Sequence, residues 1–520
     1  MSSTPSGPSN LRTSAFSNVR KTIAIVFALF VAPLLANAAP TGGQIPFNFP
    51  NLGSTSIISG GTSGVLAVGD ATIQMSAGTA TPSGVAIFAL RETGVLGFAN
   101  TGVLVTEAGV PATPLIQTGR VYVQVTNVRN TGLAMANPGV QDAVVSFSFT
   151  DTNGNTFGAG TTTVPAGQQI ARFLNEAPFN SGNPVEGTFT FSSSVPVTVI
   201  ALRTFVNERG DFLASTLPVA DLSAAKASST VVLPQFADGG GWVTSVILVN
   251  PTDNPVTGTI QFLDPSGTPW ALSATSSGPG NGNGRNKTTS TSTYNYTIPG
   301  KSSFSLTTPG TGSTTKSGSV VIVPGSSTAA PIGLAVYSYN PAGITLTEAG
   351  VPWISGTALR AYVETSDTPG AVIQSGLAVA NVSTSPATVN LQLFNPDGSA
   401  AAASTSLTIP GSGQIAKFLG DLFPNLPQPF QGVVRISTAS SGLAVVGLRT
   451  RYNERGDFLI TTTPATSESA TPGPLFFPHL AIGGGYTTQM ILFSGSPGSS
   501  SSGILNFFSQ SGTPWVVTPQ

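Results

Sequence analysis

The sequence predicts an all-β protein made of tandem β-sandwich modules, each of about 110 residues. Its hydrophobic residues come in short runs, for example 144–149, 246–249 and 389–394, which are rich in β-branched and aromatic side chains. Turn residues recur about every ten positions, which is typical of strands in a sandwich or a barrel. The chain also repeats itself over long distances, which indicates a set of like modules.

Two long stretches of the chain have nearly the same sequence. Thr106–Pro111 returns as Thr347–Pro352, an offset of 347 − 106 = 241. The heptad Asn207–Leu213 returns as Asn453–Leu459, an offset of 453 − 207 = 246. Such a long and nearly constant period predicts a repeated structural unit.

Each period is itself double, which gives four related modules. Strands that end at Arg91, Arg203, Ser338 and Arg449 mark the four copies, and they are spaced 112, 135 and 111 residues apart. The one long interval contains 276–293, a run of Ser, Gly, Asn and Thr, which we interpret as a loop inserted into the third copy.

A secretory signal peptide is expected at the N-terminus, residues 1–38. Arg12, Arg20 and Lys21 precede an apolar run at 23–35, and small residues follow up to Ala38, where we expect cleavage. The run is shorter than the roughly 20 residues that a membrane-spanning helix needs, so we expect no span in the mature protein. The predicted location is therefore secreted or at the cell surface.

The remaining chain divides into complete and partial modules. In chain order we expect the last strands of a partial module (48–112), three β-sandwich modules (113–218, 219–353 and 354–464), and the first strands of another partial module (465–520).

Half-modules are a liability because they leave sheet edges unpaired. Three explanations are open: a truncated gene, a disordered C-terminal part, or two halves that complete one another. Truncation is the preferred one of the three. Completion within a chain would close a ring, and completion between chains would allow self-association by strand addition.

Composition excludes several classes of protein. Hydrophobic residues make up 40% of the chain and charged residues 8%, so a packed core is expected. Without residues 1–38 the formal charge is (20 − 3) − 21 = −4, and no basic patch is present, so nucleic acid is not an expected partner. Cysteine is absent, and an exported chain of this composition is more typical of bacteria than of animals.

Residues suited to catalysis are scarce. His479 is the single histidine, and its counterpart in the repeat is Gln235, so we interpret it as structural. Zinc sites of the Cys/His type are excluded, and sparse carboxylates argue against a glycosidase pair. We therefore predict no enzyme activity, no cofactor and no metal. Asp151–Asn155 resembles the start of a calcium loop but lacks its distal glutamate, so we interpret it as a hairpin turn.

One glutamate recurs in each module, and we interpret it as structural. Its carboxylate would accept hydrogen bonds from backbone amides of a turn, or it would pair with the arginine at a strand end. The third copy lacks this arginine. The glutamates are Glu107, Glu208, Glu348 and Glu454, and the arginines are Arg91, Arg203 and Arg449.

Two further motifs have a functional and a structural interpretation. The tripeptides 209–211 and 455–457 spell Arg-Gly-Asp, which integrin ligands use, but they lie inside a longer repeated string, so a turn role is preferred. Exposed tryptophans could bind sugars, with Trp242 and Trp353 as the candidates.

The string from Phe477 to Gln489, together with the two repeated motifs above, resembles repeats in uncharacterised secreted bacterial proteins. The resemblance implies tandem immunoglobulin-like or fibronectin-like β-sandwiches and no known activity. Taken together, the sequence predicts a non-catalytic secreted or cell-surface protein with a structural, spacer or adhesive role, which contacts a cell-surface or extracellular-matrix component or a glycan. The alternative is a carbohydrate-binding accessory protein associated with polysaccharide degradation.

Overall fold

The computed structural model describes residues 43–61, 63–95, 97–98, 102–277, 288–369, 372–468 and 473–520. The predicted signal peptide at 1–38 lies outside the described residues. Within them the protein is nearly all β, with strands in several sheets, as the sequence predicts. The one helix of this part is α2 (Leu419–Leu422). The described residues include no helix that is both long and apolar enough to cross a membrane.

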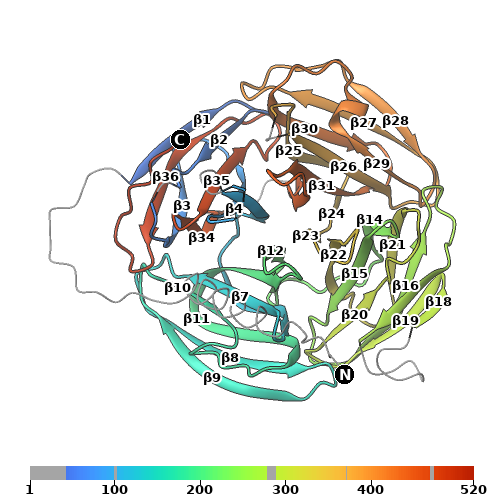
Figure 1. Ribbon diagram of the computed structural model, residues 1–520, viewed down its shortest axis with the longest axis horizontal. Helices are drawn as coiled ribbons and strands as arrows, with labels where there is room; N and C mark the ends of the chain where they lie inside the picture. The colour runs from blue at the N-terminus through green and yellow to red at the C-terminus, as the bar shows by residue number, and fades with distance from the viewer. Residues whose placement is uncertain are drawn as a thin grey trace, which may run out of the picture.

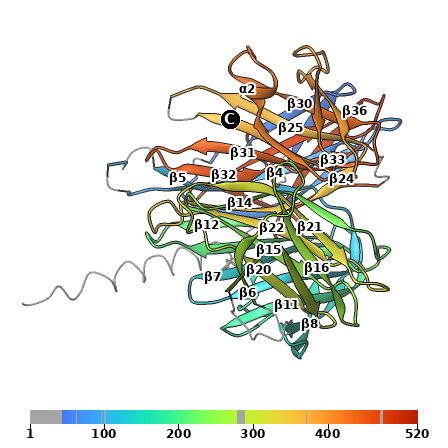
Figure 2. The ribbon, with the colours of Figure 1, turned by 90° about the vertical axis from the view of Figure 1, so that its right-hand side faces the viewer.

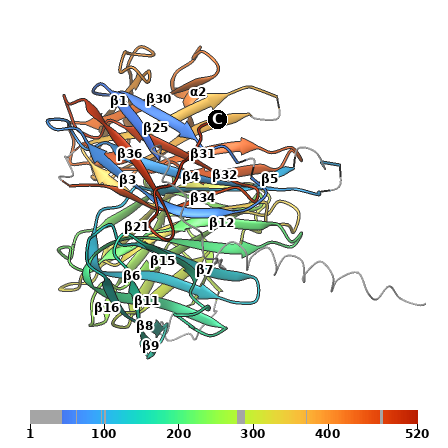
Figure 3. The ribbon, with the colours of Figure 1, turned by 90° about the vertical axis from the view of Figure 1, so that its left-hand side faces the viewer.

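The strands form four modules around a common centre (Figure 1). Module I contains β1–β5 and β34–β36, module II β6–β13, module III β14–β23, and module IV β24–β33. Side views place modules I and IV in the upper half of the molecule and modules II and III in the lower half (Figures 2 and 3).

Module III shows the strand order most clearly. One sheet has the order β14-β21-β16-β19, and the other has β18-β17-β20-β15-β22-β23. Its strands are β14 (Val231–Asp238), β15 (Trp242–Val249), β16 (Val256–Leu263), β17 (Leu272–Ser276), β18 (Thr288–Thr291), β19 (Thr293–Ile298), β20 (Ser303–Thr307), β21 (Lys316–Pro324), β22 (Ile332–Tyr339) and β23 (Thr347–Pro352). Side chains of both sheets share one hydrophobic core, so the module is two-layered.

The inserted segment of module III is only partly a loop, which corrects the sequence interpretation. Its β-branched residues in β18 pair with β17 as an antiparallel hairpin, and Thr293 already belongs to β19. Threonine, which fills three of the four positions of β18, favours a pleated strand, and β17 supplies the edge with which it pairs. Residues 278–287 lie outside the described part.

Module II repeats the same order. The strands are β6 (Ile116–Val125), β7 (Arg129–Ala136), β8 (Ala143–Asp151), β9 (Thr156–Val164), β10 (Gln169–Phe173), β11 (Val185–Val206), β12 (Phe212–Leu217) and β13 (Ala220–Asp221). The first half of β11 pairs with β6 and β8, and its second half pairs with β7 and β12, so one long strand serves both sheets.

Module IV has the same pairs again, with additional contacts that join its two layers into one ten-stranded sheet. Its strands are β24 (Ile354–Gly356), β25 (Ala358–Ser366), β26 (Ile373–Asn381), β27 (Ala387–Phe394), β28 (Thr405–Ile409), β29 (Gln414–Phe418), β30 (Phe430–Thr438), β31 (Leu443–Tyr452), β32 (Phe458–Thr462) and β33 (Thr466–Ser467).

Module I is assembled from the two ends of the described chain. Its sheets have the orders β1-β36-β3-β34 and β2-β35-β4-β5. The strands are β1 (Gln44–Phe49), β2 (Ser54–Ile58), β3 (Ala67–Met75), β4 (Ser83–Glu92), β5 (Val103–Pro111), β34 (Phe476–Ile482), β35 (Tyr486–Phe493) and β36 (Ser501–Ser509). Strands β34–β36 take the places of β14–β16 in module III, and β1–β5 take those of β19–β23. The two half-modules thus complete each other within the chain, which is the third of the explanations that the sequence leaves open.

Four strands, one from each module, surround the centre: β5, β12, β23 and β32. Neighbouring strands are linked by threonine hydroxyls, since Thr106 accepts the N–H of Ala214 at 3.0 Å and Thr461 accepts that of Gly109 at 2.8 Å. A Cβ on Gly109 or Gly350 would collide with a backbone carbonyl oxygen of the adjacent central strand. Glycine is therefore required for this close approach.

Candidate functional site

A buried carboxylate joins module III to module II. Glu348 on β23 accepts hydrogen bonds from Arg203 on β11 and, at 3.0 Å, from Nη1 of Arg129 on β7. Ser338 on β22, which lies directly opposite Glu348, donates to the same carboxylate at 2.8 Å. Burial alone would raise the pKa of Glu348, but the two arginines hold it below its ordinary value, so the group is charged. This ion pair fixes the position of one module against the next.

The equivalent carboxylate joins module I to module IV. Glu107 on β5 pairs with Arg449 and, at 3.3 Å, with Arg451, both on β31. Arg449 also pairs with Glu364 on β25, and its side chain is almost completely buried. Burial would raise the pKa of Glu107, yet the two arginines lower it. The strand-end arginines predicted from the sequence therefore pair across module interfaces.

The other two repeated glutamates also contact a neighbouring module. Glu208 accepts the N–H of Thr345 in module III at 2.7 Å. Glu454 accepts the N–H of Leu104 in module I at 2.9 Å and pairs with Arg91 at 2.6 Å. Both glutamates lie in turns that precede a central strand of their own module. Each carboxylate accepts a backbone N–H at or just before the start of the central strand of a neighbouring module.

The two Arg-Gly-Asp tripeptides bind each other across the centre. Nη2 of Arg209 lies 2.7 Å from Asp457, and Nη1 of Arg455 lies 2.9 Å from Asp211. Arg209 additionally pairs with Asp211 of its own tripeptide at 3.1 Å. Both arginines and both aspartates therefore have partners inside the molecule.

Sequence reasoning missed two buried arginines at the same interfaces. Arg120 in module II donates to the carbonyl oxygen of Asn250 in module III at 2.5 Å and to Thr190 at 2.8 Å. Arg360 in module IV donates to Ser494 Oγ in module I at 2.7 Å and pairs with Glu468 at 2.7 Å. Their equal positions, two residues before a tyrosine in each copy, are the signal that could have revealed them.

At the other two interfaces, I–II and III–IV, the residues that the structure describes form glutamine contacts and no ion pair. Gln169 in module II donates to the carbonyl oxygen of Pro478 at 2.6 Å, and its Nε2 lies 3.1 Å from Nδ1 of His479. At the III–IV interface Gln414 donates to Gln235, the counterpart of the histidine. Burial lowers the pKa of His479 to about 4, so the ring is neutral at neutral pH.

The remaining loop motifs form turns. Asp151 accepts the N–H groups of Asn153 at 2.8 Å and Asn155 at 2.9 Å, which closes the β8–β9 hairpin. In the described part of the chain, no three His, Cys, Asp or Glu side chains gather as metal ligands would. The triplets Gly239–Gly241 and Gly483–Gly485 all have φ between 59° and 91°, and they make the tight turns before β15 and β35.

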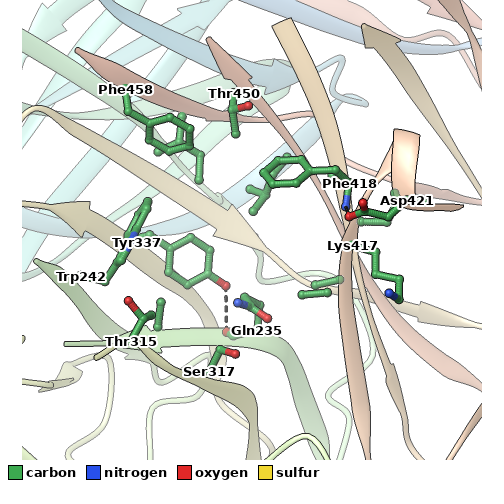
Figure 4. Close-up of a pocket in the computed structure, with 17 residues that line it drawn as sticks. Gln235, Trp242, Thr315, Ser317, Tyr337, Lys417, Phe418, Asp421, Thr450 and Phe458 are labelled. Carbon is green, nitrogen blue, oxygen red and sulfur yellow. Dashed lines mark hydrogen bonds between the residues drawn. The ribbon is translucent and has the colours of Figure 1, made fainter. Parts of the chain in front are cut away.

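A hollow of about 450 Å³ opens between modules III and IV, and Trp242 lines it. Figure 4 shows Trp242, Tyr337 and Phe458 on one side and Phe418, Lys417 and Asp421 on the other. The centroid of the Trp242 ring lies 4.7 Å from that of Tyr339 and 6.1 Å from that of Phe458, and these two contacts fix the orientation of the Trp242 ring. The Tyr337 hydroxyl donates to the carbonyl oxygen of Gln235 at 2.8 Å. The walls thus combine aromatic rings with polar groups.

A second hollow of about 270 Å³ adjoins the first, and Phe418 and Asp421 line both. Helix α2 holds both residues in place, because Leu419 and Leu422 are buried and Asp421 accepts the N–H of Phe418 at 3.3 Å. Phe418 is 42% exposed, an unusual state for phenylalanine.

Of the two tryptophans proposed from the sequence, Trp242 lines the hollow between modules III and IV. Trp353 packs beside the core of module III, where its ring lies against Gly333, and it does not line the III–IV hollow. The sequence could not indicate Tyr337, Phe418 and Phe458, since they lie on three separate strands and meet only when two modules dock.

Comparisons with known proteins assign neither a family nor an activity. No family model matches the chain, and no curated protein matches it. Among solved structures it is similar to Thermotoga maritima protein 1070, at 13% identity over 22% of this chain and 97% of that one, with a TM-score of 0.18. It is also similar to the VP2 subviral particle of infectious bursal disease virus, at 11% identity over 79% of this chain and 82% of that one, with a TM-score of 0.09. A third similar structure is a glycoside hydrolase family 32 protein from Bifidobacterium adolescentis, at 9% identity over 74% of this chain and 99% of that one, with a TM-score of 0.14.

Proposed function

We propose that this protein is an exported, non-catalytic binding protein with an adhesive role at the cell surface or outside the cell. The observation that carries the proposal is the pairing of β1–β5 with β34–β36. A chain whose first and last strands complete one module forms a compact body with fixed faces. A compact body of this kind is better suited to bind a partner than to act as a spacer, because a spacer gains its length from modules placed end to end.

The adhesive contact does not use the Arg-Gly-Asp tripeptides. Their arginines and aspartates pair with each other across the centre, so an integrin-type receptor would have to break these pairs first. The partners we propose are a cell-surface or matrix component, or a glycan.

A carbohydrate-binding accessory role is the second candidate. It is favoured by one observation: Trp242, which the sequence suggests as a sugar platform, lines a hollow together with other aromatic rings. The same exported location serves both candidates.

We further propose that the modules are immunoglobulin-like or fibronectin-like in architecture, with a strand order of their own. Two layers around one core support the likeness. In an immunoglobulin sandwich the first two strands lie in the same sheet. Here β14 and β15, the first two strands of module III, lie in different sheets, so the likeness does not extend to topology.

Self-association through the half-modules would require an exchange of strands between chains. In a single chain β34–β36 already occupy the edges that β1–β5 offer. A dimer of this kind would therefore be domain-swapped.

Cell fractionation tests the export, and surface retention tests the binding role. We expect the mature chain to begin after Ala38 and to be found outside the cytoplasm. The purified protein should be retained on immobilised envelope or matrix polysaccharide or protein. A cytoplasmic chain that keeps residues 1–38, or a mature chain retained on none of these surfaces, would contradict the proposal.

A further inference from the structure

We propose that the hollow between modules III and IV binds a pyranose sugar unit, with Trp242 and Phe418 as ring platforms. This inference rests on the proposed non-catalytic binding role and names the site and ligand class for it. The hollow is of the size that small-molecule sites usually have, and it contains few polar groups among mostly apolar ones.

The equivalent place at the I–II interface is filled, which makes the hollow a local feature and not a consequence of module docking. Phe173, the counterpart of Phe418, is 1% exposed and belongs to a continuous hydrophobic core with Phe88 and Phe212. Phe88 and Phe212 correspond to Tyr337 and Phe458. The same strands therefore enclose a packed core on one side of the molecule and an open hollow on the other.

Side chains that differ between the two interfaces explain the opening. Counted from the matching glycines Gly69 and Gly318, Val68 corresponds to Ser317, and Leu66 corresponds to Thr315. Leu66 packs against the core of module I, whereas Thr315 lies exposed and both Thr315 and Ser317 line the hollow. At the III–IV interface these small hydroxyl side chains leave space and can form hydrogen bonds. At the I–II interface larger apolar side chains occupy the same positions.

The rim of the hollow carries charged groups that can form further hydrogen bonds. Within the described part of the chain, the Lys417 ammonium forms neither a salt bridge nor a side-chain hydrogen bond. Asp421 accepts one backbone N–H and keeps a second oxygen. A charged donor and a charged acceptor beside an exposed ring can bind vicinal hydroxyls of a sugar.

A pyranose ring matches this combination. One face of the ring presents C–H groups that pack on an aromatic ring, and its edge presents hydroxyls that need donors and acceptors. The second hollow beyond Phe418 has room for a neighbouring unit, so a short oligosaccharide can pass over Phe418 with one unit on each side. A carboxylate on the sugar would add an ion pair with Lys417.

Calorimetric titration of the full mature chain with neutral and uronic-acid oligosaccharides tests the site. We expect saturable binding of at least one member, and preference for the uronic acid would show that Lys417 contributes an ion pair. Phe418→Ala should weaken binding at least tenfold. Its thermal unfolding midpoint should stay close to that of the parent, because the ring is 42% exposed.

A second variant fills the hollow without removing an aromatic ring. Thr315→Leu with Ser317→Val copies the closed interface, and we expect it to abolish binding while the protein stays folded. Trp353→Ala is the matched control, since it removes a ring of module III that does not line the hollow, and binding should persist. Absence of binding to every oligosaccharide, or binding that survives both hollow variants, overturns the proposal. Retention on protein surfaces would then still support the adhesive role.

Discussion

The module interfaces depend on single buried charges, and Glu348 is the clearest case. Glu348→Ala would leave Arg203 and Arg129 buried or half-buried without their carboxylate. We expect a loss of about 3–5 kcal/mol in the free energy of unfolding. Glu208→Ala is the matched comparison, because that residue is exposed and its carboxylate accepts only the backbone N–H and, at 3.3 Å, the hydroxyl of Thr345, so about 1 kcal/mol is expected. Denaturant unfolding of both variants measures the difference, and equal effects would contradict this account.

His479 should make the I–II interface sensitive to acid. Its ordinary pKa of 6.5 falls to about 4 in the folded protein, so the unfolded chain binds the proton first. Stability from this group is therefore full above pH 6.5 and falls as the pH drops toward 4, by up to about 3 kcal/mol. His479→Gln, which copies Gln235, should remove this loss.

The comparison must be between variant and parent, because a second buried group acts in the opposite direction. Burial raises the pKa of Asp70 to about 7, so the folded protein holds a proton that the unfolded chain releases above its ordinary value of 3.8. This group gives stability below pH 3.8 that is lost as the pH rises through 7. Unfolding titrations at pH 7 and pH 4.5 should show a smaller loss for His479→Gln than for the parent. Parallel losses would show that the histidine does not matter.

At the scale of strands, the four central elements depend on close backbone approach. A Cβ on Gly350 in β23 would strike the carbonyl oxygen of Thr216 in β12. We expect Gly350→Ala to cost about 1–3 kcal/mol, as overpacked positions do. Gly64→Ala is the control, because nothing lies within 4 Å of a Cβ there, and it should change stability by less than about 0.5 kcal/mol. Thermal or denaturant unfolding of the pair provides the measurement.

Strand content and the repeat could be predicted from the sequence because they depend on local pattern and on internal comparison. The pairing of β1–β5 with β34–β36 was one of three open explanations, since no local signal tells which edges meet over more than 400 residues. Arg203 and Arg449 were candidate partners for the repeated glutamates, but the sequence could not tell that they bind Glu348 and Glu107, because each of these pairs joins two different modules. The hollow depends on the docking of two modules, and among its lining residues the sequence indicates a ligand contact for Trp242 alone.

At the scale of the molecule, two kinds of interface alternate around the ring. II–III and IV–I contain the buried arginines and glutamates, whereas I–II and III–IV contain the glutamine contacts. This alternation explains why the longest sequence identity recurs after two modules and not after one. It also provides an internal control for the hollow, since I–II is the same kind of interface in closed form.

Ring closure by the two ends of the chain is the central claim, and an engineered disulfide tests it most directly. Gln44 on β1 lies opposite Asn506 on β36, and their side chains hydrogen-bond at 3.0 Å on the surface. Directly opposed residues of this kind are within disulfide reach. The chain has no native cysteine, so Gln44→Cys with Asn506→Cys introduces the one possible bridge.

Non-reducing electrophoresis and size-exclusion chromatography of this double variant give the answer. We predict an oxidised monomer whose migration changes on reduction, because the bridge closes a loop within one chain. Gln44→Cys with Val140→Cys is the control, and it should form no bridge within the chain because β1 pairs with β36, whereas Val140 lies between β7 and β8 of module II. Disulfide-linked dimers or longer chains, or thiols that remain free under oxidation, would contradict a ring closed by its own ends.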